Sequence, residues 1–212
     1  MFQFEKDMIP VLKDNLSKLY KTQYFATEFN TGNGVADLVF TTEMNDESLF
    51  LDDYALMSLY VTYFKGKKRL NKENLYDNCT DRIRLKKLLN FLERAEYILS
   101  DKSDFVQTKK YKPHTQNLIS IEAKLRDWKS GFHQALRYQF FSHKSFLAFP
   151  EQYIHRVDTN LLQKYRIGLI SVRREGIKVL LNPKKRNPED LISYFFLSEN
   201  FAQSFKETEL YH

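Results

Sequence analysis

Three side chains of this sequence could together bind a metal ion and assist the cleavage of a covalent bond: Asp37, Glu122 and Lys124. Glu122 and Lys124 are two residues apart in a short apolar run, 118–125. Residues two apart on a β-strand point to the same face, so this carboxylate and this ammonium group would converge. Asp37 interrupts another apolar run, GVADLVF. A buried carboxylate is unfavourable unless it is paired or binds a cation, so these residues predict a site. A structural ion pair or a contact with a backbone amide would also account for Asp37.

Helices and a hairpin are expected to position these residues. The segment 5–21 has apolar residues at helical spacing and is predicted to be an amphipathic helix. The runs 24–29 and 35–42 predict a hairpin across the loop NTGNG, whose Gly and Asn residues tolerate positive φ. A strand over 118–125 precedes a predicted helix, whose apolar positions hold Trp128, Phe132, Ala135, Leu136 and Phe140.

Length and composition describe a globular chain with enough apolar residues for a core. It has 212 residues, 42% of them hydrophobic and 15% aromatic, which suits one domain or a domain with a sizeable insertion. The single cysteine, Cys79, excludes an intrachain disulfide and a cysteine-based zinc cluster. No run approaches the roughly 18 apolar residues of a membrane span, and a signal-peptide pattern is absent at the N-terminus. We therefore expect a cytoplasmic protein that does not enter a membrane.

The order of these parts resembles the PD-(D/E)XK nuclease superfamily, whose core is a mixed β-sheet flanked by helices. Asp37 matches the first acid of that pattern, and Glu122-Ala123-Lys124 matches its second acid and lysine. Gln134 and Tyr138, four apart on the following helix, match the Gln-x-x-x-Tyr element of part of the superfamily. One departure is Ala36, which stands where the full motif has proline before the first acid.

The resemblance covers roughly residues 1 to 45 and 115 to 182 of the chain. It implies an α/β fold with a restriction-endonuclease-like core, that is, a mixed sheet with helices on its faces. It also implies metal-dependent hydrolysis of phosphodiester bonds, with Mg²⁺ as the cofactor and Mn²⁺ able to substitute for it.

The same resemblance implies a role for each residue of the site. Asp37 and Glu122 would bind the metal ion, and the carbonyl group of Ala123 would be a third ligand. Lys124 would orient or deprotonate the attacking water and stabilise charge near the scissile phosphate. Gln134 would point from its helix toward the metal or the lysine, with an ordinary helix-surface amide as the alternative.

A basic insertion is predicted between the two halves of this site. The 84 residues 38–121 are far more than a hairpin or crossover needs, and we expect an independent domain at 49–112 within a core formed by 1–48 and 113–212. Residues 65–112 include 14 basic and 7 acidic side chains, whereas the rest of the chain has 19 basic and 20 acidic. A basic domain in an otherwise neutral chain points toward a polyanion, most often nucleic acid.

This insertion resembles a winged helix-turn-helix. Helices are predicted at 53–64, 72–78 and 82–97, followed by two strands around an exposed turn at 100–104. Asp81 is the expected N-cap of the third helix, which has Ile83 on its core side with four leucines and stands in the recognition-helix position. The residues expected near DNA are Arg82, Arg84, Lys86, Lys87 and Asn90, with Lys67, Lys68 and Arg69 on flanking phosphates. A solvated basic face and a protein-interaction module are the alternatives.

The sequence as a whole predicts a Mg²⁺-dependent endonuclease whose inserted domain grips duplex DNA. Two alternatives remain open: a non-catalytic DNA-binding or regulatory protein on a nuclease-like scaffold, and a nuclease that acts on RNA. The enzyme is favoured because a scaffold gains nothing from burying two carboxylates beside a lysine. A homodimer is also open, since cutting both strands commonly requires two active sites. The chain has no P-loop and no dinucleotide-binding fingerprint, so ATP-driven activity would need another subunit.

Overall fold

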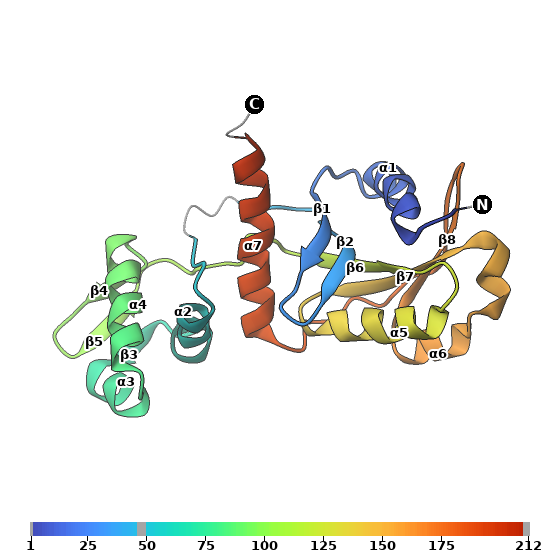
Figure 1. The fold of residues 1–212 in the computed structure, drawn as a ribbon. Coiled ribbons are helices and arrows are strands. Elements are labelled where there is room, and N and C mark those ends of the chain that lie inside the picture. Colours follow the sequence, from blue (N-terminus) through green and yellow to red (C-terminus); the bar gives the residue numbers. More distant parts are fainter. Residues whose placement is uncertain (1, 46–49, 210–212) are drawn as a thin grey trace. The chain divides into compact units, whose positions relative to one another are not determined.

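The computed structural model describes residues 2–45 and 50–209, and its elements are shown in Figure 1. The chain divides into two compact units. The first unit comprises Met1–Met44, Thr115–Asp190 and Phe201–His212, and the second comprises Asn45–His114 and Leu191–Asn200. The second unit therefore interrupts the first in sequence, close to the predicted boundaries. It differs from the predicted insertion by including Leu191–Asn200, which the prediction assigned to the core.

The first unit is an α/β fold built on a mixed six-stranded sheet with the order β1-β2-β6-β7-β8-β9. Its strands are β1 (Phe25–Asn30), β2 (Val35–Thr41), β6 (Leu118–Ala123), β7 (Lys144–Pro150), β8 (Gly168–Arg173) and β9 (Gly176–Leu181). β6, β7 and β8 run parallel to one another, and the remaining pairs are antiparallel. The predicted hairpin and the predicted strand with Glu-x-Lys are confirmed as β1-β2 and β6, whereas β9 was not anticipated.

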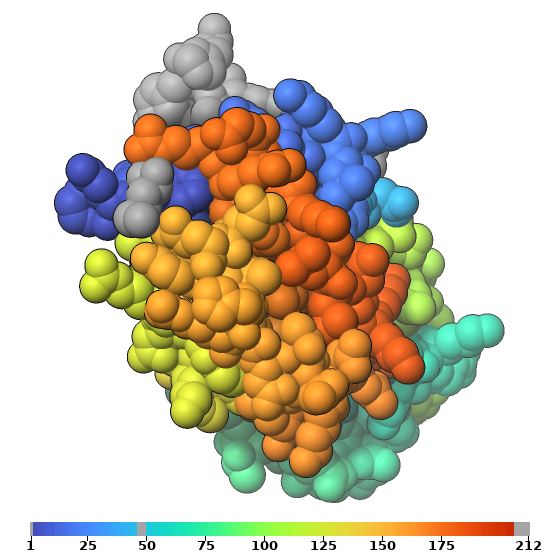
Figure 2. Space-filling model, turned by 90° about the vertical axis from the view of Figure 1, so that its right-hand side faces the viewer, coloured from blue at the N-terminus to red at the C-terminus, as the bar shows by residue number. Residues whose placement is uncertain are grey.

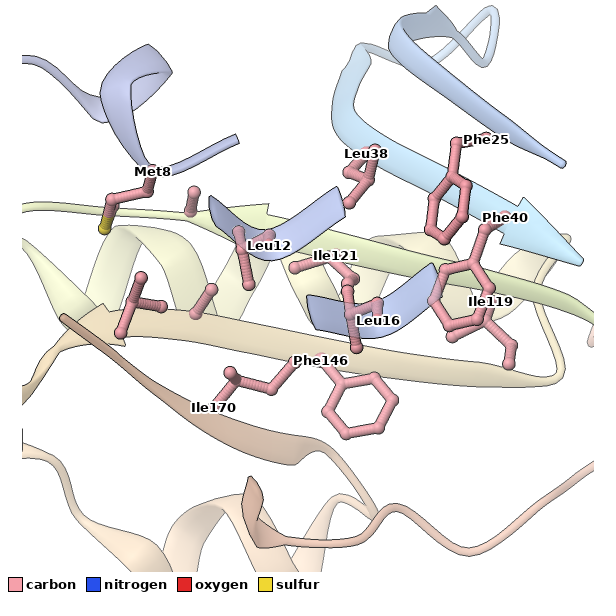
Figure 3. Close-up of a cluster of buried hydrophobic side chains, with 13 residues drawn as sticks. Met8, Leu12, Leu16, Phe25, Leu38, Phe40, Ile119, Ile121, Phe146 and Ile170 are labelled. Atoms are coloured by element: carbon pink, nitrogen blue, oxygen red, sulfur yellow. The ribbon is translucent and has the colours of Figure 1, made fainter. Parts of the chain in front are cut away.

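Helices cover both faces of this sheet, as the alternation along β7 shows. Phe146 and Ala148 pack with helix α1 (Met8–Tyr20), whose buried residues Met8, Leu12 and Leu16 are spaced four apart (Figure 3). Leu147 and Phe149 point to the other face, where they pack with the helices α5 (Trp128–Arg137) and α6 (Thr159–Lys164). The segment that carries α6 and β9 is orange in Figure 2. Short 3-10 helices complete the unit at Glu5–Asp7, Tyr138–Phe140 and Glu151–Arg156.

The second unit contains three helices and a small antiparallel sheet. Its elements are α2 (Tyr54–Leu59), a π-helical turn (Tyr60–Phe64), β3 (Arg69–Asn71), α3 (Lys72–Asn78), α4 (Arg82–Arg94), β4 (Ile98–Ser100) and β5 (Asp104–Gln107). The sheet order is β3-β5-β4. Asp81 caps α4 as predicted, because its Oδ1 accepts a hydrogen bond of 3.0 Å from the backbone N of Arg84. The prediction missed β3, and it placed Ile83 wrongly: this side chain is 85% exposed rather than buried in the core.

Helix α7 (Leu191–Glu209) contributes aromatic residues to the core of each unit. In the second unit, Phe195 packs near Tyr111, with their ring centroids 6.3 Å apart. In the first unit, Phe201 is fully buried and lies 6.0 Å from Phe29, measured between ring centroids. The aromatic residues of α7 are therefore used for packing within each unit. Within the described residues, no helix combines the length and apolar character that crossing a membrane requires.

A buried polar network lies in the second unit around Glu199 of α7. The Glu199 side chain is 0% exposed, and its carboxylate accepts a hydrogen bond from the Tyr111 hydroxyl. It also lies 3.3 Å from Nε2 of His114 and accepts a hydrogen bond of 3.3 Å from the backbone N of Leu51. The Phe50 ring stacks on His114, with the centroids 4.0 Å apart. A carboxylate with this many partners anchors the segments that meet on it.

Candidate active site

The strands β2 and β6 diverge where the two acidic residues lie. Their antiparallel pairing ends at Leu38 and Ile121, and beyond that point β2 continues to pair only with β1. Asp37 and Glu122 are the next residues of the two strands. Asp37 Oδ2 accepts a hydrogen bond of 2.7 Å from the backbone N of Ala123, whereas Oδ1 has no partner among the described residues. The carboxylate of Asp37 thus accepts the hydrogen bond that a backbone carbonyl of a paired strand would otherwise accept from Ala123. Its Oδ1 remains open to a ligand.

Glu122 and Lys124 form a close ion pair, although β6 ends at Ala123 and Lys124 follows the strand rather than lying within it as predicted. Glu122 is 1% exposed, and its Oε1 lies 2.8 Å from Nζ of Lys124. Lys124 Nζ also lies 3.3 Å from Oε2 of Glu5, which precedes α1. The other oxygen of Glu5 accepts a hydrogen bond of 3.2 Å from the backbone N of Leu125. Glu5 therefore belongs to the site, although its spacing in the sequence did not single it out.

Tyr138, at the end of α5, fixes the second oxygen of Glu122. The Tyr138 hydroxyl oxygen lies 2.8 Å from Glu122 Oε2 and 2.7 Å from the carbonyl oxygen of Val35 on β2. A hydroxyl has one proton and therefore donates to one of these oxygens at a time. Because Val35 and Glu122 lie on different strands, Tyr138 links the two strands beyond the point where they diverge.

Helix α5 comes very close to Lys124 at Gly131. A Cβ atom at Gly131 would lie 2.7 Å from Cγ of Lys124 and 2.6 Å from Cδ1 of Leu147, both too short for normal contacts. The start of the helix is fixed by its N-cap Asp127, whose Oδ1 accepts a hydrogen bond of 3.0 Å from the backbone N of Ser130. Only glycine lets the helix pack this closely against the lysine.

Replacing Gly131 with alanine is therefore expected to displace Lys124 and destabilise the protein. The added methyl group must push Lys124 or Leu147 aside, and overpacking of this kind destabilises a protein by about 1–3 kcal/mol. The free energy of unfolding, from urea titration, measures the effect. Ser130→Ala on the exposed side of α5 is the control, and it should change this free energy by less than about 0.5 kcal/mol. Equal free energies of unfolding for the two variants would contradict the close packing of α5 against Lys124 at Gly131.

The acids repel one another, and the lysine compensates them. Burial raises the pKa of Glu122 above its usual value, and the neighbouring charge of Asp37 raises it further. Burial likewise raises the pKa of Asp37, with smaller contributions from Glu5 and Glu28. Burial alone would lower the pKa of Lys124, but the hydrogen bond and the charge of Glu122 raise it above its usual value. Lys124 is therefore held as a cation within an acidic cluster.

Glu28 has an unusual backbone conformation beside this cluster. Its φ is 49°, which non-glycine residues adopt infrequently. The pairing of β1 with β2 passes from Thr27 with Leu38 to Phe29 with Ala36, which leaves Glu28 across from Asp37. Backbone strain of this kind is often found next to functional sites.

The site residues predicted from the sequence differ in how the structure places them. It brings together Asp37, Glu122, Ala123 and Lys124. Gln134 has one hydrogen bond among the described residues, with Ser130 Oγ at 3.4 Å, and its catalytic role stays a prediction. The structure adds Gly131 to the site and brings Glu5 to Lys124. Tyr138, which the sequence marked only as part of the Gln-x-x-x-Tyr element, contacts Glu122. A glycine inside a helix that follows a functional strand is a signal for close packing that sequence reasoning could have used.

The donor set suits a hard divalent cation. Within the described residues there is no group of three or more His, Cys, Asp or Glu side chains that could hold a metal ion. Asp37 and Glu122 supply two carboxylates, which is the usual number for Mg²⁺, since this ion keeps several of its own waters. The pKa values of both carboxyl groups are raised, and a cation bound by the two carboxylates would lower them again. The residues present are thus compatible with Mg²⁺.

The basic residues predicted to contact DNA lie on the surface of the second unit. Arg82, Arg84, Lys86, Lys87 and Asn90 are exposed along α4, and Lys67, Lys68 and Arg69 are exposed before and at the start of β3. Arg84 forms an ion pair of 2.7 Å with Asp81, and Lys87 forms one of 3.5 Å with Asp53. Arg69 lies 3.2 Å from Asp104. Their contact with nucleic acid stays a prediction.

The comparisons with known proteins found no match: no protein-family model, curated protein or solved structure matches this chain.

Proposed function

We propose that this protein is a metal-dependent nuclease that hydrolyses phosphodiester bonds of DNA. The observation that carries the proposal is the meeting of Asp37, Glu122 and Lys124 where β2 and β6 diverge. These are the residues that resemble the acids and the lysine of PD-(D/E)XK nucleases, and they come from segments 85 residues apart. The mixed sheet with helices on both faces supports the restriction-endonuclease-like core that the same resemblance implies.

The carboxylates would hold Mg²⁺ between β2 and β6. Asp37 Oδ1 has no partner among the described residues, and Glu122 would exchange its contact with Lys124 for one with the cation. The carbonyl oxygen of Ala123 is the third proposed ligand. Bound Mg²⁺ would polarise a phosphate oxygen and lower the pKa of a water molecule.

Lys124 would act as a cation rather than as a base. Its pKa lies above its usual value, chiefly because the hydrogen bond and charge of Glu122 outweigh burial, so it remains protonated at neutral pH. A protonated lysine can hold the attacking water and stabilise the negative charge that develops on the phosphate. Glu5 would keep the ammonium group at the strand end when Glu122 turns to the metal ion.

The non-catalytic alternative requires these residues to be structural. Asp37 does accept a hydrogen bond from a backbone amide, which is the contact that a structural role predicts. A structural role explains Glu122 less well. Lys124 and Tyr138 are its partners, but Asp37 still repels it, and apolar residues usually replace buried ion pairs without loss of stability. The electrostatic repulsion within the site thus favours a cation-binding role.

The second unit would bind the DNA. Its elements follow the order helix, strand, helix, helix, strand, strand, and its sheet has the order β3-β5-β4. Both features support the resemblance to a winged helix, with α4 as the recognition helix and the β4-β5 hairpin as the wing. The excess of positive charge in residues 65–112 provides the non-specific affinity for phosphates.

An assay of nucleic acid cleavage tests the proposal. Supercoiled plasmid, linear duplex DNA, single-stranded DNA and RNA are each incubated with the protein in Mg²⁺ and, in parallel, in EDTA. We expect cleavage of DNA that depends on Mg²⁺ and ceases in EDTA. Cleavage confined to RNA would establish the RNA alternative. DNA binding without cleavage of any substrate in Mg²⁺ or Mn²⁺ would contradict the enzyme and favour the regulatory protein.

A further inference from the structure

The positive residues of α4 fall into two groups with different surroundings. Arg84 and Lys87 form ion pairs with Asp81 and Asp53, which are the N-caps of α4 and α2. Any phosphate that approached them would also meet these carboxylates. Arg82 and Lys86, four residues apart, have no acidic partner among the described residues. The two groups therefore differ in net charge although they lie on the same helix.

Arg82 and Lys86 line a groove between α3, α4 and the β4-β5 hairpin. The groove has a volume of about 580 Å³, and its other lining residues are Lys72, Tyr76, Leu89, Asn90, Glu93, Ser100 and Phe105. Three of these nine side chains are basic and one is acidic. The groove is therefore cationic, and it is open to solvent rather than enclosed.

Aromatic rings lie beside two of the three basic side chains of this groove. The guanidinium carbon of Arg82 lies 5.2 Å from the ring centroid of Tyr76. Lys72 Nζ lies 5.1 Å from the ring centroid of Phe105 and 2.7 Å from Ser100 Oγ. A side chain that is already oriented loses less conformational entropy when it binds a ligand. Arg82 stacked on Tyr76 is thus prepared to bind an oxyanion.

We propose that this groove is the phosphate-binding surface of the second unit and that a DNA backbone lies in it, held by Arg82 and Lys86. The proposal takes its ligand from the proposed function, and it narrows the predicted DNA-binding set. Arg82, Lys86 and Asn90 are assigned to the contact, whereas Arg84 and Lys87 serve the packing of α2 and α4. Phosphates are bound here because the groove presents cations and one amide side chain.

Two double variants with the same loss of charge separate these groups. Arg82→Gln with Lys86→Gln removes two positive charges from the groove, and Arg84→Gln with Lys87→Gln removes two from the ion-paired side of the same helix. Binding of a fluorescein-labelled duplex of mixed sequence is measured by anisotropy over a series of NaCl concentrations. EDTA is present throughout, so that no metal-dependent cleavage takes place. Thermal melting of each variant verifies that α4 remains folded.

The groove variant is expected to bind the duplex about 10-fold to 100-fold more weakly than the native chain at moderate salt. The slope of log K against log salt is negative, and each lost phosphate contact reduces its magnitude by about 0.9. The magnitude should therefore decrease by about 2 in the groove variant. The ion-paired variant should change affinity by less than about threefold. Equal losses in both variants, a larger loss in the ion-paired variant, or no loss in either would overturn the proposal. If the groove variant binds more weakly but the native chain cleaves nothing, this inference is upheld and the nuclease is contradicted. If the native chain cleaves DNA but the groove variant binds as the native chain does, the nuclease is upheld and this inference is contradicted.

Discussion

Replacing Lys124 with methionine is expected to abolish DNA cleavage and leave DNA binding intact. Methionine keeps most of the length and apolar stem of lysine but removes the ammonium group that lies 2.8 Å from Glu122. Loss of one group that stabilises charge in a transition state lowers turnover by about 100-fold to 1000-fold. The rate of plasmid nicking at saturating Mg²⁺ measures this loss, and anisotropy with labelled duplex measures binding.

The matched control for this variant is Lys129→Met. Lys129 is the second residue of α5, is exposed, and has no ion pair among the described residues. The two variants lose the same charge, so a general effect of charge on DNA affinity would appear in both. Nicking by the Lys124 variant at the rate of the Lys129 variant would remove Lys124 from the mechanism.

Replacing Glu199 with alanine is expected to destabilise the protein by about 3 kcal/mol, because it removes a buried carboxylate that several polar groups contact. The Tyr111 hydroxyl, the imidazole of His114 and the backbone N of Leu51 would each lose a partner inside the second unit. The free energy of unfolding, from urea titration followed by circular dichroism, measures the change.

Two further variants show that the effect belongs to the network. Glu199→Gln keeps an oxygen that can accept from Tyr111 or Leu51, so it should destabilise the protein less than alanine does. Glu73→Ala removes an exposed acid from α3 and should change the free energy of unfolding by less than about 0.5 kcal/mol. If Glu199→Ala were as stable as Glu73→Ala, the network would not anchor α7.

The elements that carry Asp37, Glu122 and Lys124 could be predicted because each has a local signal. The hairpin is marked by its loop NTGNG, and the strand β6 by an apolar run with two charges on one face. Glu5 could not be placed in this way, since its contacts with Lys124 and Leu125 span about 120 residues of chain and depend on how α1 crosses the sheet.

The errors in the predicted second unit have physical reasons as well. Ile83 was assigned to the core from its apolar character, but it stands two positions before Leu85 and therefore on the opposite side of α4. The strand β3 has three residues, too few to show an alternating pattern. The segment Leu191–Asn200 belongs to the second unit, where Phe195 and Glu199 contact residues far away in the sequence, and no local pattern reveals such contacts.

The most direct test of the proposed active site is the Mg²⁺-dependent cleavage of plasmid DNA by Asp37→Asn and Glu122→Gln, compared with Asp14→Asn on the exposed face of α1. The two amide substitutions keep side-chain size and remove one charge each. If Asp37 and Glu122 hold the metal ion, both variants will lose cleavage by about 100-fold or more while they bind duplex DNA as the native chain does, and Asp14→Asn will cut normally. Cleavage by Asp37→Asn and Glu122→Gln at the native rate would contradict the assignment of this site.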